Sequence, residues 1–162
     1  MAELVLERIF DAPVERVWKA WTDPVELAKW WGPRSFTAPD NKIDLRVGGK
    51  FIYSMQANGD LAKQFGDKVL YGGGEYTEII EGKKIVYLDS FTDKDGNLVS
   101  PAIYGMPADF PQYSEVTVEF ERLPDGKTKM TVTHAGLPTG KQAEDTSAGW
   151  KEMFDKLAEN LQ

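Results

Sequence analysis

The sequence contains no cysteine and a single histidine, His134, among its 162 residues. Without cysteine the chain cannot form disulfides, thiolate nucleophiles, iron–sulfur clusters or cysteine-type zinc sites. One histidine also excludes a metal site built from several imidazoles, and a Ser-His-Asp arrangement would have to use His134. The composition therefore leaves His134 as the one imidazole available for proton transfer or ligand contact.

Positive charge is also scarce, because 19 Lys and Arg residues stand against 26 Asp and Glu, a formal net charge of −7. Such a balance disfavours non-specific binding to nucleic acid or to an anionic membrane. No apolar run approaches the roughly 20 residues of a membrane span, and segment 1–7 lacks the basic and apolar regions of a signal peptide. We therefore expect one cytoplasmic domain over residues 1–162 that binds neither nucleic acid nor membrane.

Aromatic side chains, by contrast, are abundant, with 5 Trp, 6 Tyr and 8 Phe. Near the N-terminus, apolar residues recur at i, i+3, i+4 and i+7, the spacing of one helix face: Val14, Val17, Trp18 and Trp21. Pro13 suits the first turn of this helix. The same face should pack against a sheet.

A second short helix should follow directly. Asp23 is its expected N-cap, with Pro24 in the first turn and Glu26 at the capping-box position. The sequence Gly32-Pro33 should end it. Its apolar face consists of one leucine and two tryptophans, Leu27, Trp30 and Trp31.

Most of the remaining sequence is typical of β-strands. Strands are expected at 3–10, 35–46, 50–57, 69–81, 84–92, 113–122 and 128–135, and a turn is expected at 58–60. The run Gly72-Gly73-Gly74 favours a bend or bulge in a curled sheet. A long helix should occupy 139–161, with Thr139 and Gln142 at capping-box spacing, and its interior Gly149 would suit close approach of another backbone.

Residues 93–112 show neither a strand nor a helix pattern and contain three prolines, Pro101, Pro107 and Pro111. A segment of this length without regular structure is uncommon in one domain and is usually functional. Tyr104 and Met106 would suit a cover over a cavity. We therefore interpret 93–112 as a candidate lid.

Several motifs in a fixed order resemble START-like (SRPBCC) proteins, in the branch named after the activator of the 90-kDa heat-shock-protein ATPase (AHSA-like). They are Phe10-Asp11-Ala12-Pro13, Val17-Trp18, Trp21-Thr22-Asp23-Pro24, Trp30-Trp31-Gly32-Pro33, Arg46-Val47-Gly48-Gly49-Lys50-Phe51, Thr133-His134 and Gly149-Trp150. The resemblance covers essentially the whole chain. It implies an α+β helix-grip fold, in which a curved antiparallel seven-stranded sheet surrounds a long C-terminal helix and two short helices follow the first strand.

The same resemblance implies a cavity between sheet and helix that often holds an apolar ligand. We therefore expect this chain to bind a small apolar or aromatic molecule, without a cofactor or a metal. The residues expected to line the cavity are Trp30, Trp31, Phe36, Tyr53, Tyr104, Met106, His134, Trp150, Met153 and Phe154.

Two other functions remain open from the sequence. An aromatase/cyclase-like enzyme acting on polyketides would need a group that moves protons, for which His134, Asp89 and Glu75 are the candidates. The apolar residues on both faces of 85–91 leave it open whether Asp89 points inward. A cochaperone-like interaction module is the other alternative, and both a monomer and a homodimer are compatible with the sequence.

Overall fold

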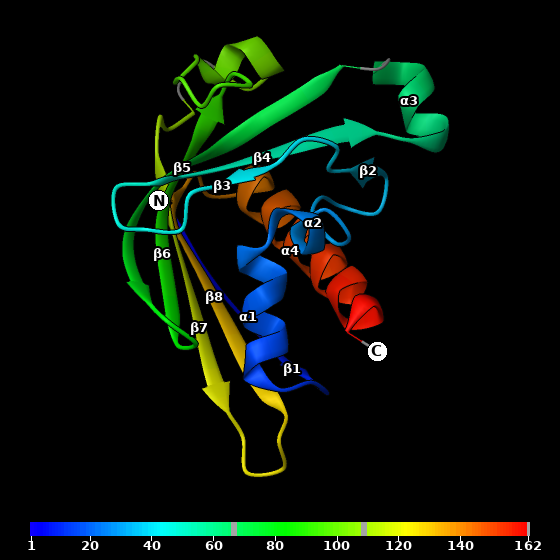
Figure 1. Ribbon diagram of the computed structural model, residues 1–162. Coiled ribbons are helices and arrows are strands. Elements are labelled where there is room, and N and C mark those ends of the chain that lie inside the picture. The colour runs from blue at the N-terminus through cyan, green and yellow to red at the C-terminus, as the bar shows by residue number, and fades with distance from the viewer. Residues whose placement is uncertain (66–67, 108–109, 162) are drawn as a thin grey trace.

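The long helix α4 (Lys141–Asn160) lies against one face of a curved antiparallel sheet (Figure 1). Helices α1 (Val14–Thr22) and α2 (Pro24–Leu27) lie on the same side of the sheet. This computed structural model describes residues 1–65, 68–107 and 110–161. Within these residues seven strands follow one another in the order β1-β8-β7-β6-β5-β4-β2, and β3 pairs with a further part of β4. The architecture is the α+β helix-grip fold that the resemblance implies.

The strands are β1 (Ala2–Phe10), β2 (Phe36–Thr37), β3 (Lys42–Ile43), β4 (Lys50–Ala57), β5 (Val69–Ile80), β6 (Lys84–Thr92), β7 (Ser114–Arg122) and β8 (Thr128–Leu137). Six of them lie within two residues of a predicted strand at each end. The predicted N-cap is also confirmed, because the Asp23 carboxylate accepts the backbone N–H groups of Val25 at 2.8 Å and Glu26 at 3.3 Å. Glu26 does not complete a capping box, since its carboxylate pairs with Lys29 at 2.6 Å.

The prediction of a continuous strand at 35–46 is wrong. Only β2 and β3, of two residues each, pair with β4 there. Between them, side chains replace backbone pairing: Asn41 Oδ1 accepts the backbone N–H of Ser54 at 3.0 Å, and the Ser54 hydroxyl accepts the N–H of Asp40 at 2.8 Å. Pro39, which has no N–H to donate, stands at this interruption.

Two further local predictions are wrong. The expected turn at 58–60 opens the helix α3 (Gly59–Phe65), since the carbonyl of Asn58 accepts the N–H of Ala62. The expected capping box of Thr139 and Gln142 is absent from the start of α4, where Gly140 with φ 84° is the N-cap and no side chain caps the helix.

The glycine run in β5 holds the unusual backbone that its sequence indicates. Gly73 has φ 125°, and a Cβ there would lie 1.9 Å from the carbonyl oxygen of Phe51 on β4. Only glycine fits such a position. The register shift of the β5–β6 ladder lies farther along, between Tyr76 and Glu78.

The core fills the space between the sheet, α1 and the C-terminal half of α4. Trp21 and Trp30 are fully buried in it, and their indole N–H groups donate to the Met130 sulfur at 3.2 Å and the Ala20 carbonyl at 3.0 Å. The N-terminal half of α4 faces a cavity instead.

Candidate ligand-binding pocket

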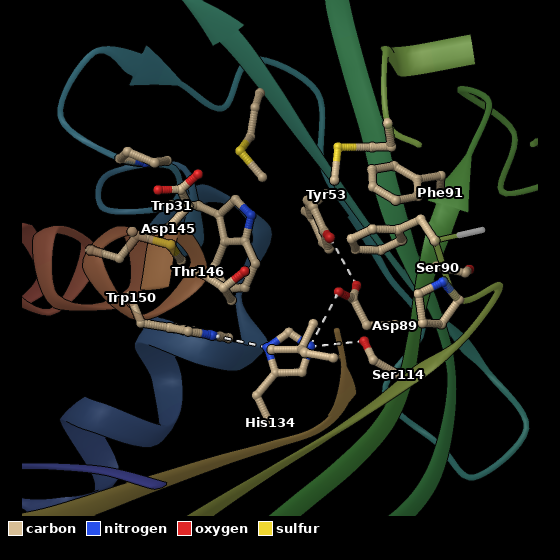
Figure 2. Close-up of a pocket in the computed structure, with 18 of the residues that line it drawn as sticks. Trp31, Tyr53, Asp89, Ser90, Phe91, Ser114, His134, Asp145, Thr146 and Trp150 are labelled. Atoms are coloured by element: carbon tan, nitrogen blue, oxygen red, sulfur yellow. Dashed lines mark hydrogen bonds and ion pairs between the residues drawn. The ribbon is translucent and has the colours of Figure 1, made fainter. Parts of the chain in front are cut away.

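A cavity of about 290 Å³ opens between the sheet, the N-terminal half of α4 and the segment after β6. Most of its lining is aromatic, sulfur-containing or aliphatic, with a few polar groups on its floor (Figure 2). The lining residues are Trp31, Pro33, Tyr53, Met55, Tyr87, Asp89, Ser90, Phe91, Met106, Phe110, Pro111, Ser114, His134, Leu137, Asp145, Thr146, Gly149, Trp150 and Met153.

Strand register brings the polar floor together from three neighbouring strands. Asp89 on β6 pairs directly with Ser114 on β7, and Val116, two residues along β7, pairs with His134 on β8. Because side chains alternate between the two faces of a strand, Asp89, Ser114 and His134 all point toward α4. Figure 2 shows His134 with Trp150 on one side and with Ser114 and Asp89 on the other.

Both ring nitrogens of His134 are committed to protein partners. The indole N–H of Trp150 donates to Nδ1 at 3.1 Å, and Nε2 lies 2.8 Å from the Ser114 hydroxyl oxygen. Since an indole nitrogen can only donate, Nδ1 must be the acceptor, and the proton of the neutral ring is on Nε2. Burial lowers the pKa of His134 to about 4, so the ring is uncharged near neutral pH and its Nε2–H donates to the Ser114 hydroxyl.

Asp89 is the inward-facing carboxyl of the floor, with 20% of its side chain exposed. Its Oδ1 accepts the Tyr53 hydroxyl at 2.8 Å, and its Oδ2 lies 3.9 Å from Nε2 of His134. Burial raises the pKa of Asp89 to about 7, opposed by the hydrogen bonds from Tyr53 and the Ser90 backbone. Because His134 is neutral at that pH, the contact between Asp89 and His134 is not an ion pair.

A ring of aromatic side chains forms the wall above this floor. Trp31 lies with its centroid 4.9 Å from that of Tyr53 and 5.7 Å from that of Trp150. The Trp31 indole nitrogen is buried and has no hydrogen-bond acceptor in the described part of the chain. A buried donor without a partner is rare in proteins, so this N–H is a candidate contact for a ligand acceptor.

The segment 93–112 contributes to the wall as a partial cover, with residues 108 and 109 outside the described residues. Met106, Phe110 and Pro111 line the cavity. Tyr104, at the end of the short helix η1 (Pro101–Tyr104), is not in the lining; its hydroxyl donates to the Thr92 carbonyl at 2.6 Å, and its ring centroid lies 5.8 Å from that of Phe91.

Six of the ten residues predicted to line a cavity are in this lining: Trp31, Tyr53, Met106, His134, Trp150 and Met153. The other four, Trp30, Phe36, Tyr104 and Phe154, are not. Trp30 and Phe154 belong to the packed core, because helical spacing alone does not separate core positions from cavity positions. Glu75 is exposed, since the alternation of β5 turns its neighbour Tyr76 inward, and it cannot act in the pocket.

The structure adds lining residues that the sequence reading missed. Among them are Met55, which follows Tyr53 by two positions on β4, and Phe91, which follows Asp89 by two on β6. Period-two alternation from Tyr53 would have found Met55. Phe91 could not be found in this way, because the sequence leaves the direction of Asp89 on β6 open. Gly149 also lines the cavity, and the atom nearest to an added Cβ there is Cγ of Pro33, at 3.6 Å. Within the described residues no backbone atom of another element lies within 4 Å of that Cβ, so the close backbone approach expected from the sequence is wrong.

Two further findings concern metal ligands and membrane-spanning helices. Within residues 1–65, 68–107 and 110–161, no three His, Asp or Glu side chains are grouped so that they could hold a metal ion. No helix in those residues is long and apolar enough to span a membrane.

The fold and the pocket together define a START-like helix-grip domain. Residues 11–162 match the family described as Activator of Hsp90 ATPase homolog 1-like protein, and the chain belongs to that family. The comparison with curated proteins found no match.

Several solved structures share this fold over nearly the whole chain. Protein CV1439 from Chromobacterium violaceum is 28% identical with a TM-score of 0.77, and the match covers 98% of this chain and 96% of that one. Protein Ms6760 from Mycobacterium smegmatis is 28% identical with a TM-score of 0.72, over 98% and 87% of the two chains. The AHSA1 protein SPO3351 from Silicibacter pomeroyi has a TM-score of 0.74 at 20% identity, over 99% and 97%, a likeness of fold alone.

Proposed function

We propose that this protein binds a small, largely apolar ligand in the pocket between its sheet and α4. The observation that supports this most directly is a cavity of about 290 Å³ with mainly apolar walls and a few convergent polar groups. Small-molecule sites combine these features, because apolar walls supply affinity and a few polar groups fix orientation. The volume is at the lower end of the range for such sites, roughly 300–1,000 Å³, and favours a small ligand.

Three features of the wall support the view that the cavity is a ligand-binding site and not a gap left by imperfect packing. The Trp31 indole N–H has no acceptor within the described residues, although it is buried. Met55, Met106 and Met153 provide flexible side chains that can adjust to a ligand. Gly149 leaves a gap where any larger side chain on α4 would enter the cavity.

A titration with the uncharged fluorescent probe N-phenyl-1-naphthylamine tests this function. The wild-type protein should bind it saturably with a one-to-one stoichiometry. Gly149→Leu, which fills the cavity from α4, should lower the affinity at least about tenfold, since the lost apolar contact corresponds to roughly 1.5–3 kcal/mol. The matched control Ala148→Leu adds an apolar side chain at the neighbouring exposed position of the same helix and should bind like wild type. Non-saturable binding, or equal loss in both variants, would exclude the pocket as the site.

Proton transfer on a bound ligand is the second candidate function, favoured by Asp89. A carboxyl with a pKa of about 7, facing an apolar pocket, can both take up and return a proton near neutral pH. The test is exchange of the α-hydrogens of 2-tetralone for deuterium in heavy water, with and without protein. Asp89→Asn should abolish any acceleration, and no acceleration by wild type would exclude this activity for that ketone.

A further inference from the structure

Most polar atoms on the pocket floor already have protein partners. The Tyr53 hydroxyl donates to Oδ1 of Asp89, and His134 uses Nδ1 for Trp150 and Nε2 for Ser114. The Ser90 backbone also donates to the carboxyl of Asp89, but for Oδ2 of this residue the described part of the chain supplies no side-chain donor within hydrogen-bond distance. Nε2 of His134 is 3.9 Å away, beyond hydrogen-bond range.

The charges of the described lining all have one sign. Asp89 on the floor and Asp145 on α4 are acidic, His134 is neutral near pH 7, and no Lys or Arg side chain is among the lining residues. An anionic group on a ligand would find no cation to pair with and would face a carboxylate in a desolvated site. Burying an unpaired charge is strongly unfavourable, so the pocket disfavours carboxylates and phosphates.

Aromatic rings whose planes are inclined to one another form the apolar part of the pocket. Trp31 lies at 46° to Tyr53 and at 87° to Trp150, and Phe91 joins the same lining from β6. Rings arranged in this way offer both faces and edges to a flat guest, the geometries that aromatic pairs prefer. Asp89 lies below Tyr53 and Phe91 in the view of Figure 2, on the side of the pocket formed by the sheet.

We propose that the pocket selects aromatic ligands that end in an uncharged hydroxyl group, as in a phenol, with this hydroxyl donating to Oδ2 of Asp89. The proposal rests on the proposed binding function and adds the ligand class and the residue that recognises it. Tyr53 acts as the positioning residue, because its bond to Oδ1 directs Oδ2 into the cavity. The body of the ligand occupies the space between Trp31, Tyr53 and Trp150.

The experiment compares three probes that share one ring system: naphthalene, 2-naphthol and 2-naphthoate. Each displaces N-phenyl-1-naphthylamine from the wild-type protein at pH 8, where Asp89 is ionised and 2-naphthol is still uncharged. A hydrogen bond to a charged acceptor should make 2-naphthol bind about tenfold more tightly than naphthalene. The 2-naphthoate anion should bind most weakly. Equal affinity for naphthalene and 2-naphthol, or tightest binding of 2-naphthoate, would overturn the proposal.

Asp89→Asn is the decisive variant, and Asp40→Asn is its matched control. Asp40 also accepts a tyrosine hydroxyl, that of Tyr71 at 2.9 Å, but neither residue lines the cavity. Asp89→Asn should reduce the preference for 2-naphthol over naphthalene to about twofold or less and should strengthen binding of 2-naphthoate. Asp40→Asn should keep the wild-type order, and an unchanged preference in Asp89→Asn would overturn the assignment.

Wild-type protein alone provides a second readout that needs no variant. Lowering the pH from 8 to 5.5 protonates Asp89 and removes its charged acceptor, so the preference for 2-naphthol should shrink severalfold while naphthalene affinity stays constant. A preference that does not change with pH would contradict the role of Asp89. Failure of the binding function itself would look different, because no probe would then displace N-phenyl-1-naphthylamine from a saturable site.

Discussion

The phenol ring of Tyr53 lies against the α-carbon of Gly72 on the neighbouring strand. A Cβ at Gly72 would come within 2.6 Å of the Tyr53 hydroxyl oxygen and 2.7 Å of the ring carbon that carries it. The missing side chain therefore makes the space through which Tyr53 reaches Asp89, 2.8 Å away. The run Gly72-Gly73-Gly74, which in the sequence indicates only a bend in the sheet, thus also shapes the floor of the pocket.

Gly72→Ala should therefore displace Tyr53 and break its hydrogen bond to Asp89. We expect the free energy of unfolding to fall by about 1–3 kcal/mol, the usual effect of overpacking, and probe affinity to fall with it. Urea denaturation measures the stability change. A double-mutant cycle with Tyr53→Ala is the control, because the cost of the added methyl group should shrink once the ring is gone. The same cost in both backgrounds would show that the clash is not with Tyr53.

The pH dependence of stability should reveal the protonation state of Asp89. Its pKa is about 7 in the folded protein against an ordinary value of 3.8, so between these values the folded state binds more protons than the unfolded state. The contribution of Asp89 to the free energy of unfolding therefore decreases as the pH rises from 4 to 7, by roughly 4 kcal/mol. Asp89→Asn removes the decrease, so its advantage over wild type should grow from near zero at pH 4 to several kcal/mol at pH 8. An advantage that stays constant over this range would contradict the raised pKa.

His134 should give the opposite slope. Burial lowers its pKa from 6.5 to about 4, so between these values the unfolded state binds more protons and stability increases with pH, by roughly 3 kcal/mol. The two groups largely cancel in the wild-type protein. Stability should rise from pH 4 to 6.5 in Asp89→Asn and fall from pH 4 to 7 in His134→Phe, as measured by urea denaturation. If the free energy of unfolding changed with pH in the same direction in both variants, the opposite pKa shifts of Asp89 and His134 would be excluded.

The strands of this fold follow from local sequence where turn residues bound them on both sides. Strands β4 and β6 have the predicted bounds, and Asp23 caps α2 as its sequence indicates. The segment 35–46 could not be predicted in this way. The backbone N–H of Asp40 donates to the Ser54 hydroxyl, and the Asn41 side chain accepts the backbone N–H of Ser54, contacts that depend on how β4 lies beside this segment.

The candidate site was predictable only in part, for a related reason. Helical spacing marks Trp30 and Phe154 as apolar but does not say whether they face packed core or empty space. Asp89 lies in a strand that is apolar on both faces, and its inward direction is fixed by pairing with Ser114 on β7. Whether a polar side chain of this strand faces the pocket thus depends on the register between neighbouring strands, which the sequence of one strand does not encode.

Lys156 on α4 supports the pocket wall from outside. Its ammonium donates to three backbone carbonyls, those of Trp31 at 3.3 Å, Gly32 at 2.9 Å and Phe36 at 3.3 Å. Lys156→Met keeps the alkyl chain but leaves these carbonyls without the donor, so we expect a loss of about 1–3 kcal/mol in the free energy of unfolding. Lys151→Met, at an exposed position of the same helix, should change stability by less than about 0.5 kcal/mol. Thermal or urea denaturation measures both stability changes. An equal loss in the two variants would show that the carbonyl contacts of Lys156 are not the cause.

Trp150 fixes the tautomer of His134, and Trp150→Phe should release it. The variant keeps an aromatic ring beside the imidazole but removes the N–H that donates to Nδ1 at 3.1 Å. Without that donor, the neutral ring can carry its proton on either nitrogen, and the buried Nδ1 loses its partner. We expect a stability loss of about 1–3 kcal/mol, to which the smaller ring contributes. The specific readout is the nitrogen-15 chemical shifts of the imidazole, which should report a protonated Nε2 in wild type and a mixture of tautomers in Trp150→Phe. A wild-type spectrum with the proton on Nδ1 would contradict the hydrogen-bond assignment, because the indole could not then donate to that nitrogen.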